Sequence, residues 1–501
     1  NNIDTVALQA ALNNGSYNPF ATAPASETVL RAILPSAFDR NRSRLTEYTL
    51  RLDGPLFDLP AGEVKAAFGA SYMKLSQWRS AIGVKATSDV PLAEASRNIK
   101  AAYGEVYVPL VGEDMGVPAM QRLVVNLALR TEDYSDAGST TNPKIGLTWD
   151  VTDGVSLRGA WGKSFRAPNL IENNPIFFSR VSLITLSNLS GDPAIGLTNA
   201  VTNQTNVLNV AGSNADLVPE TARNYSFGID IDPSLIEGFR LSATYYNVKY
   251  KNQILGLQGF GASYLASAAN RALYAPYITP AIQPATCVNG NRSTYNPLYL
   301  PALGRPTVAT IDESNMCSAR AITYTQNTNA ANVLQDGIDV QTSYRFATGA
   351  SEWTLSGSLT KILRNRTQIV AGGPVIDGRD IMNYPVSLRG RGSITWKHGP
   401  VTVQPALNYV GSYTNNLPIT VAGVTQPVKT VPAWTTFDLT VGVDLEWIGT
   451  GWARGLDLNL NVRNLTDKDP PVVLSANGNA FDAQNANPYG TIATAQITKR
   501  F

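Results

Sequence analysis

Apolar and polar residues alternate over many short stretches of this chain, and the alternation is clearest between 142 and 169. There Ile145, Leu147 and Trp149 are separated by single small or polar residues, and a second run of the same kind follows a short turn at 152–154. A period of two gives a strand one apolar and one polar face. The stretch therefore predicts a β-hairpin.

The same test predicts fifteen strands along the chain, and the hairpin supplies the fifth and sixth. The fourteenth, at 455–463, is the most regular, because leucine and valine alternate there with aspartate, asparagine and arginine. The other strands are predicted at 46–52, 63–77, 96–108, 121–133, 223–231, 238–250, 335–346, 351–362, 387–397, 400–411, 434–445 and 490–501.

Composition favours an all-β transmembrane protein over a soluble one. Charged residues make up 16% of the chain, below the roughly 25% usual for soluble domains, yet the chain contains no apolar run long enough for a membrane helix. Soluble β-sandwiches are the alternative, but fifteen strands would then need several cores, and no linker between domains is visible. One transmembrane antiparallel β-barrel gives every apolar face to lipid. The net charge of +2 gives no reason to expect a nucleic-acid partner.

Long and short connections alternate from the fifth strand onward. Short periplasmic turns and long extracellular loops are the rule for outer-membrane barrels, so we expect even-numbered strands to run outward. Residues 1–45 are then expected to be an extracellular loop remnant and 46–501 the barrel domain. Because bacterial barrels have even strand numbers, an odd count predicts that an N-terminal part is missing. The long loops are predicted at about 164–222, 251–334, 363–386, 412–433 and 464–489.

Several motifs carry a resemblance to a known family. They are the aspartate-tyrosine-serine to phenylalanine-arginine-alanine-proline stretch within 128–172, the leucine-x-proline-glutamate-threonine loop end within 216–254, and the asparagine-leucine-x-aspartate-lysine loop with the closing strand at the C-terminus. DGIDV at 336–340 and DGPLFDLPAGEV at 53–64 add to them. In order and spacing they resemble TonB-dependent outer-membrane receptors, and the resemblance covers most of the chain.

The resemblance implies a 22-stranded barrel, of which these would be the last fifteen strands, closed by a plug domain that lies outside this chain. It implies active import of siderophore-iron, cobalamin or oligosaccharide across the outer membrane of a Gram-negative bacterium. The implied partners are a TonB-type inner-membrane complex, the barrel-assembly machinery, outer-membrane lipids and the missing N-terminal part of the receptor. A passive porin-like channel and a surface-binding barrel without transport are the alternatives.

Candidate ligand-binding residues concentrate in the loop predicted at 251–334. Tyrosine and arginine side chains stack on flat or sugar-like ligands. The alternative is that the tyrosines belong to the girdle of aromatic residues at the membrane interface. The candidates are Tyr264, Tyr274, Tyr277, Arg292, Tyr295, Tyr299 and Tyr324.

Other residues suggest structural roles. Arg158 and Arg166 are predicted to face the lumen within a lattice of paired charges rather than to bind ligand. Cys287 and Cys317 lie in one polar loop without a nearby histidine, which predicts a disulfide, with free thiols as the alternative. The terminal Phe501 resembles the signal read by the barrel-assembly machinery, although an ordinary membrane-facing aromatic is the alternative.

The sequence offers no enzyme site. Its one histidine, His398, lies in a short turn, and a metal site needs more ligands than one. No nucleophile beside a base and no phosphate-binding glycine loop stand out. We therefore expect neither catalysis nor a resident metal or cofactor.

Overall fold

The structure is a computed structural model, and a large antiparallel sheet dominates it. It describes residues 3–21, 25–34, 38–82, 90–187, 204–257, 264, 268–305, 311–416, 420–421, 424–425, 428–448, 451–473 and 480–500.

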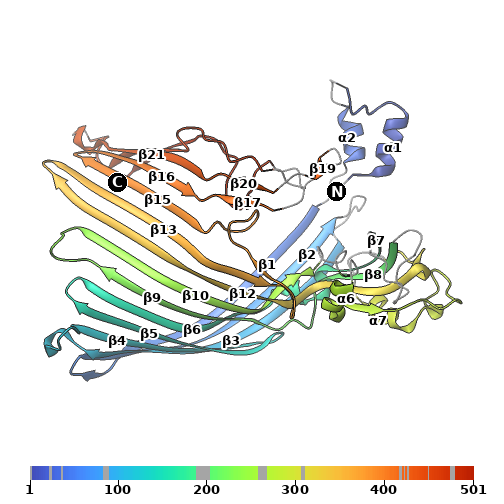
Figure 1. The fold of residues 1–501 in the computed structure, drawn as a ribbon, viewed down its shortest axis with the longest axis horizontal. Coiled ribbons are helices and arrows are strands. Elements are labelled where there is room, and N and C mark those ends of the chain that lie inside the picture. The colour runs from blue at the N-terminus through green and yellow to red at the C-terminus, as the bar shows by residue number, and fades with distance from the viewer. Residues whose placement is uncertain are drawn as a thin grey trace.

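Fifteen of the described strands pair one after another in chain order, which confirms the predicted antiparallel architecture. They are β1 (Phe38–Leu59), β2 (Gly62–Ile82), β3 (Val90–Val111), β4 (Arg122–Tyr134), β5 (Gly138–Thr152), β6 (Val155–Arg166), β9 (Glu220–Ile231), β10 (Phe239–Gly256), β12 (Ala319–Thr348), β13 (Ser351–Gln368), β15 (Leu388–His398), β16 (Val401–Val410), β21 (Trp434–Asp444), β22 (Leu456–Arg463) and β23 (Ile492–Lys499). Every step between neighbours is antiparallel, and β1 and β23 form the two edges among the described residues. Figure 1 shows them as one long curved sheet.

The remaining elements are short and belong to the loops and the N-terminal segment. The strands are β7 (Ser179–Ser187), β8 (Gln204–Gly212), β11 (Ile278–Pro280), β14 (Val375–Asp377), β17 (Tyr413–Asn415), β18 (Thr420–Val421), β19 (Val424–Thr425) and β20 (Lys429–Val431). The helices are α1 (Thr5–Asn13), α2 (Glu27–Ile33), α3 (Leu170–Asn173), α4 (Pro175–Phe178), α6 (Ala268–Leu273) and α7 (Leu300–Leu303). None of the helices in the described ranges has the length and apolar character needed to cross a membrane.

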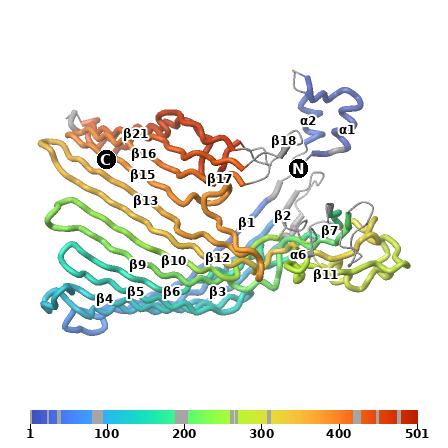
Figure 2. The backbone as a smooth tube through the Cα atoms, viewed as in Figure 1, coloured from blue at the N-terminus to red at the C-terminus, as the bar shows by residue number. Residues whose placement is uncertain are grey.

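Several strands extend further than the alternation predicts, and β1, β3 and β12 do so toward the end of the sheet where the long loops gather (Figure 2). β1 and β3 are also longer than predicted at their other ends. β1 begins at Phe38 rather than at 46, so part of the predicted 1–45 loop is strand, and α1 and α2 precede it. Arg42 pairs with Trp78 and Asn41 with Arg79 in this extension. The stretch from 39 to 44 is polar on both faces, so its sequence carries no period-two signal although its backbone still pairs.

The sheet separates an apolar face from a polar face. In the hairpin of β5 and β6, Ile145 pairs with Trp161, and both project to the same side. Large side chains on this apolar face are left uncovered: Leu129 is 52% exposed and Phe227 61% exposed. Large exposed apolar patches mark sites that contact a protein or a membrane. The apolar face therefore suits contact with lipid, and the polar face suits the lumen of a barrel.

Gly154 in the turn between β5 and β6 shows how tightly the short turns pack. Its φ is +81°, and a Cβ there would lie 2.3 Å from the carbonyl oxygen of Asp232 in the next turn. Only glycine fits both the left-handed conformation and this close approach. The short turns at this end of the sheet thus pack against one another.

Candidate functional site

Two of the long loops fold together into a second, smaller sheet. β7 pairs antiparallel with β8, β8 pairs in parallel with the first part of β12, and β11 pairs with the other side of β12. We call these strands, together with the segment from Ala268 to Ser318 as far as it is described, the loop domain. Since β12 is 30 residues long and continues into the main sheet, one strand joins the two. In Figure 1 the loop domain lies at the long-loop end of the main sheet.

Both faces of the loop-domain sheet are buried. On one face Leu208 and Ile322 pack in a cluster with Tyr299, and on the other face Val207 packs in a cluster with Tyr264. A strand buried on both faces needs apolar side chains at neighbouring positions, and the pair Val207 and Leu208 provides this. The loop domain is therefore a folded unit with two small cores of its own.

The structure places most of the candidate tyrosines in these cores. The exposed fraction is 0% for Tyr264 and Tyr299, 4% for Tyr295 and 8% for Tyr274. The hydroxyl of Tyr264 donates to the carbonyl oxygen of Tyr324 at 3.1 Å, and that of Tyr299 donates to Ala281. Burial raises the pKa of both phenols above its ordinary value, so both stay protonated. In this structure these rings stabilise the loop domain and offer little surface to a ligand.

The other candidates in this loop are more accessible. Tyr277 and Tyr324 are half-buried, and Tyr277 stacks beside Tyr264 with 6.2 Å between ring centroids. Arg292 is exposed and donates to Glu313 at 2.6 Å. Contact of these three residues with a ligand stays a prediction.

Replacing Tyr299 with phenylalanine is expected to cost the loop domain about 1 kcal/mol. The ring still fills its place in the core, but the carbonyl of Ala281 loses the donated hydrogen bond. Hydrogen exchange of the amides of β8 and β12, followed by mass spectrometry, measures the loss. Tyr489→Phe is the matched control, because Tyr489 is 66% exposed and surface changes fall within about 0.5 kcal/mol. Equal exchange in both variants would show that the hydrogen bond contributes nothing.

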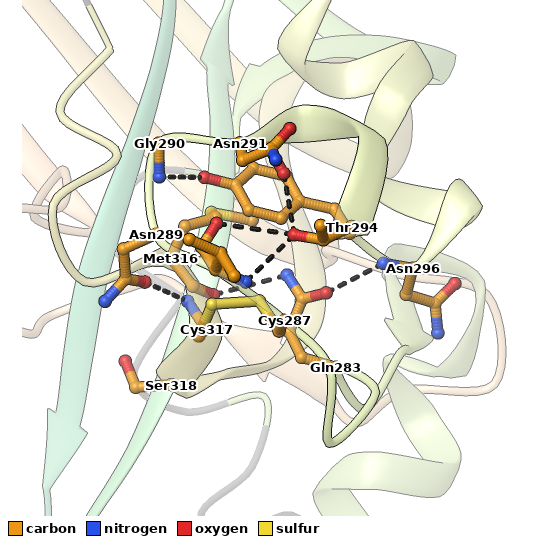
Figure 3. The surroundings of a disulfide bond; sticks show 12 residues. Gln283, Cys287, Asn289, Gly290, Asn291, Thr294, Asn296, Met316, Cys317 and Ser318 are labelled. Atoms are coloured by element: carbon orange, nitrogen blue, oxygen red, sulfur yellow. Dashed lines mark hydrogen bonds between the residues drawn. A yellow bond between two sulfur atoms is a disulfide. The ribbon is translucent and has the colours of Figure 1, made fainter.

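The disulfide predicted between Cys287 and Cys317 is present, and it joins residues 30 positions apart. Figure 3 shows side chains of the same segment around it. Asn289 accepts a hydrogen bond from the backbone N–H of Cys317 at 2.7 Å, and Gln283 donates to the carbonyl of Met316 at 3.2 Å. These contacts fasten the two ends of the segment to each other beside the cluster that contains Tyr299 and Met316.

Arg166 joins two of the motifs at the long-loop end of the main sheet. It stands opposite Glu220 in the register of β6 and β9 and donates two hydrogen bonds of 2.7 Å to that carboxylate. It also donates to Glu172 at 2.9 Å. Glu220 is 2% exposed and additionally accepts from the hydroxyl of Tyr250 and, at 2.6 Å, from the N–H of Ile254. The half-buried arginine of one motif thus pairs with the buried glutamate of the other.

Arg158 belongs to a row of polar side chains on the polar face. Its guanidinium donates to Asp230 at 2.6 Å, to Ser242 at 2.8 Å and to Thr244 at 2.7 Å, so one arginine links three strands. A hollow of about 650 Å³ lies beside this row, and its lining includes Asp230, Arg240, Ser242, Gln341, Ser358 and Arg391. Hydroxyls, amides and charges of both signs make it a suitable surface for a polar solute in transit.

The one histidine, His398, has no visible binding role among the described residues. Its ring nitrogen Nδ1 lies 2.8 Å from the hydroxyl of Ser351, where β15 ends beside the start of β13. Across the described residues, no three histidine, cysteine, aspartate or glutamate side chains come together as a metal would require. Phe501 lies outside the described residues, so its role as an assembly signal stays a prediction.

Glu220 is the residue that the sequence did not single out. The leucine-x-proline-glutamate-threonine motif drew attention as a whole, but nothing in it shows that its glutamate is buried. Its partner Arg166 lies 54 positions away, across loops of unknown path. The available signal was an acid three positions before a predicted strand, and this signal does not identify a partner.

Comparison with known proteins agrees with this geometry. A family model described as TonB dependent receptor-like, beta-barrel, matches residues 2–465. The probable TonB-dependent siderophore receptor PirA of Acinetobacter baumannii is 29% identical over 133 residues, which cover 26% of this chain and 15% of that protein. The heme/hemopexin utilization protein C of Haemophilus influenzae is 24% identical over 204 residues, covering 38% of this chain and 25% of that protein.

Solved structures show the same fold at low sequence identity. A mutant of the ferric enterobactin receptor PfeA of Pseudomonas aeruginosa, bound to enterobactin, is 16% identical with a TM-score of 0.54, and the match covers 92% of this chain and 54% of that one. The siderophore receptor PirA from Acinetobacter baumannii is 15% identical with a TM-score of 0.50, covering 95% and 65%. The chain therefore spans about half the length of PfeA. Because the family match runs over nearly the whole chain, this protein belongs to the TonB-dependent receptors through their β-barrel.

Proposed function

We propose that this protein is the barrel of a receptor that imports a scarce iron chelate across the outer membrane of a Gram-negative bacterium. The observation that carries the proposal is the family match over residues 2–465. Of the two curated relatives, one is named a siderophore receptor and the other a heme/hemopexin utilization protein. Their names favour an iron chelate over cobalamin or an oligosaccharide. The proposal includes energy from a TonB-type inner-membrane complex, relayed by a plug outside this chain, and it includes no catalytic step.

The geometry supports import in two ways. The loop domain is a folded body at the long-loop end, where a ligand arrives from outside the cell. Below it the polar face carries the hollow of about 650 Å³, whose serines, glutamine and charged side chains exchange hydrogen bonds with a passing solute. In this proposal, exposed loop residues such as Arg292 make the first contacts with the ligand, and the polar face carries it inward.

Under iron limitation, cells that lack the gene are expected to take up ⁵⁵Fe only at the background level of unloaded cells. The ⁵⁵Fe is supplied as at least one ferric siderophore or as heme. A plasmid copy of the gene should restore uptake. Uptake should also stop when a protonophore collapses the proton gradient, because import against a concentration gradient needs energy. Growth on glycans, with and without the gene, serves as the parallel test of an oligosaccharide substrate.

The two alternatives give different results in the same assay. A passive porin-like channel would carry the solute equally well with and without the protonophore. A surface-binding barrel without transport would retain ⁵⁵Fe on the cells in a form that a competing external chelator removes. Either outcome would contradict the proposed import, and uptake of glycan alone would contradict the iron chelate.

A further inference from the structure

Basic side chains from four strands of the main sheet form a row near the long-loop end, and the row also crosses β12, which supplies a leucine. In the hydrogen-bonded register Lys163 of β6 stands opposite Arg223 of β9, and Arg223 stands opposite Lys249 of β10. On its other side Lys249 stands opposite Leu334 of β12, and Leu334 stands opposite Arg366 of β13. We call Lys163, Arg223, Lys249 and Arg366 the outer basic row. All four are exposed.

The outer basic row lies on the apolar face and not on the lumen side. Side chains two positions apart on a strand share a face. Trp161 lies two positions before Lys163, Tyr225 lies two positions after Arg223, and Trp161 and Tyr225 pair with each other. Phe227, next on the same face, is 61% exposed. The lumen row of Arg158, by contrast, occupies the alternate positions. The outer basic row therefore projects outward, toward the medium that surrounds the barrel.

No acid neutralises the first three members within the part of the chain that the structure describes. The nearby acids already have partners: Asp336, two positions along β12 from Leu334, accepts from Arg364 and Tyr245, and Asp377 opposite Arg366 is held by Arg379 at 2.7 Å. Cross-strand neighbours place their Cβ atoms about 5 Å apart, and like charges in such pairs are destabilising. Three cations in register therefore call for an anion from outside the chain.

A hollow of about 570 Å³ opens beside the row. Its lining includes Lys249, Lys251, Asn332, Leu334, Arg366 and Val375, which combine three cations with apolar side chains. The aromatic side chains of Trp161, Tyr225 and Phe227 lie just beyond the row, toward the middle of the strands. Aromatic girdles mark the level where hydrocarbon meets headgroups. The row and its hollow are therefore at headgroup level.

We propose that the outer basic row binds the phosphate groups of an anionic lipid in the outer leaflet of the surrounding membrane. Lysine and arginine donate charge-assisted hydrogen bonds to phosphate oxygens, and Leu334 and Val375 contact the apolar part of the same molecule. This inference goes beyond the proposed import. It needs only that the apolar face lie in a membrane, so a failed uptake assay and a failed lipid assay remain distinguishable.

The test compares lipid binding by the purified full receptor and a double variant, Arg223→Gln with Lys249→Gln. Phosphatidic acid, which carries a phosphomonoester, is added to the protein in detergent, and native mass spectrometry gives the dissociation constant. Each cation near a membrane surface changes the dissociation constant of an anionic lipid by about tenfold or less. The loss of two cations is therefore expected to raise this constant about thirtyfold. Phosphatidylcholine, without net charge, should bind weakly to both proteins.

Arg240→Gln with Arg345→Gln is the matched control, because it removes two cations from the other face and should leave phosphatidic acid binding unchanged. Retained folding of each variant is checked by its electrophoretic mobility before and after heating. Equal binding by the wild-type protein and the Arg223/Lys249 variant would overturn the proposal, and so would an equal loss in the control. Inorganic phosphate that binds the row as tightly as phosphatidic acid would identify a free-anion site instead of a lipid site.

Discussion

Replacing Arg166 with alanine is expected to lower the free energy of unfolding of the receptor by about 3 kcal/mol. The change leaves the carboxylate of Glu220, 2% exposed, without the guanidinium that neutralises it. Tyr250 and the N–H of Ile254 still donate hydrogen bonds, but neither supplies a positive charge. Denaturant unfolding of the protein in detergent micelles, followed by tryptophan fluorescence, measures the loss.

Arg158→Ala is the matched control for this experiment. Arg158 also pairs with an acid on the polar face, but Arg158 and Asp230 are 41% and 42% exposed. Water screens such a pair, so its loss is expected to cost no more than about 1 kcal/mol. A similar loss in both variants would show that the burial of Glu220 is not what makes Arg166 important.

A second variant separates the stranded charge from the lost contacts. Adding Glu220→Gln to Arg166→Ala removes the charge while keeping a side-chain oxygen for Tyr250 and Ile254. The double variant is therefore expected to regain at least about 1 kcal/mol relative to Arg166→Ala alone. If the double variant were less stable than the single one, the buried charge would not be the cause.

The strands of the main sheet could be predicted because one face of each strand suits lipid and the other suits the lumen, so apolar and polar residues alternate. Leu456, Leu458 and Leu460 face one way and Asp457 and Asn459 the other, and the strand they form begins one position after its predicted start. The predicted ends are wrong where strands continue beyond the apolar band, as in β1. There water contacts both faces, so backbone pairing persists without any alternation in the sequence.

The loop domain could not be predicted for the opposite reason. Val207, Leu208 and Val210 are buried on both faces of their strand, so no polar face alternates with them. β8 also pairs in parallel with β12, as at Leu208 and Ile322, across more than a hundred positions of chain. No short turn fixes such a register. β7, β8 and β11 lie within the stretches predicted as loops at 164–222 and 251–334, but the sequence did not show how they fold.

The candidate tyrosines show the same limit at the level of single residues. Tyr295 and Tyr299 lie among proline, asparagine and serine, and Tyr264 lies among glycine, alanine and serine. In such settings an aromatic ring fits a binding surface as well as a small core. Only the tertiary pairing of β8, β11 and β12 decides between the two, and it buries all three rings. The cysteines were easier to interpret, because a covalent partner within one loop needs little knowledge of the fold.

Replacing Cys287 and Cys317 together with serine is expected to destabilise the loop domain by about 3 to 4 kcal/mol, because the disulfide closes a chain segment of 30 residues and restricts its unfolded state. The segment supplies Tyr295 and Tyr299 to the core against Leu208. When it opens, that core is exposed to water while the main sheet keeps its pairing. The loss is therefore expected to be local to the loop domain.

Hydrogen exchange measured by mass spectrometry tests this directly. Amides of the described residues between Ala281 and Ser318, and those of β8, are expected to exchange faster in the Cys→Ser double variant, whereas those of β13 and β15 in the main sheet stay protected. Wild-type protein treated with dithiothreitol should show the same pattern, because it loses the same covalent bond without a change of sequence. Unchanged exchange in the loop domain would mean that packing around Met316 and Tyr299, both 0% exposed, holds the segment without the disulfide. Faster exchange throughout the main sheet would instead show that the loop domain and the barrel unfold as one unit.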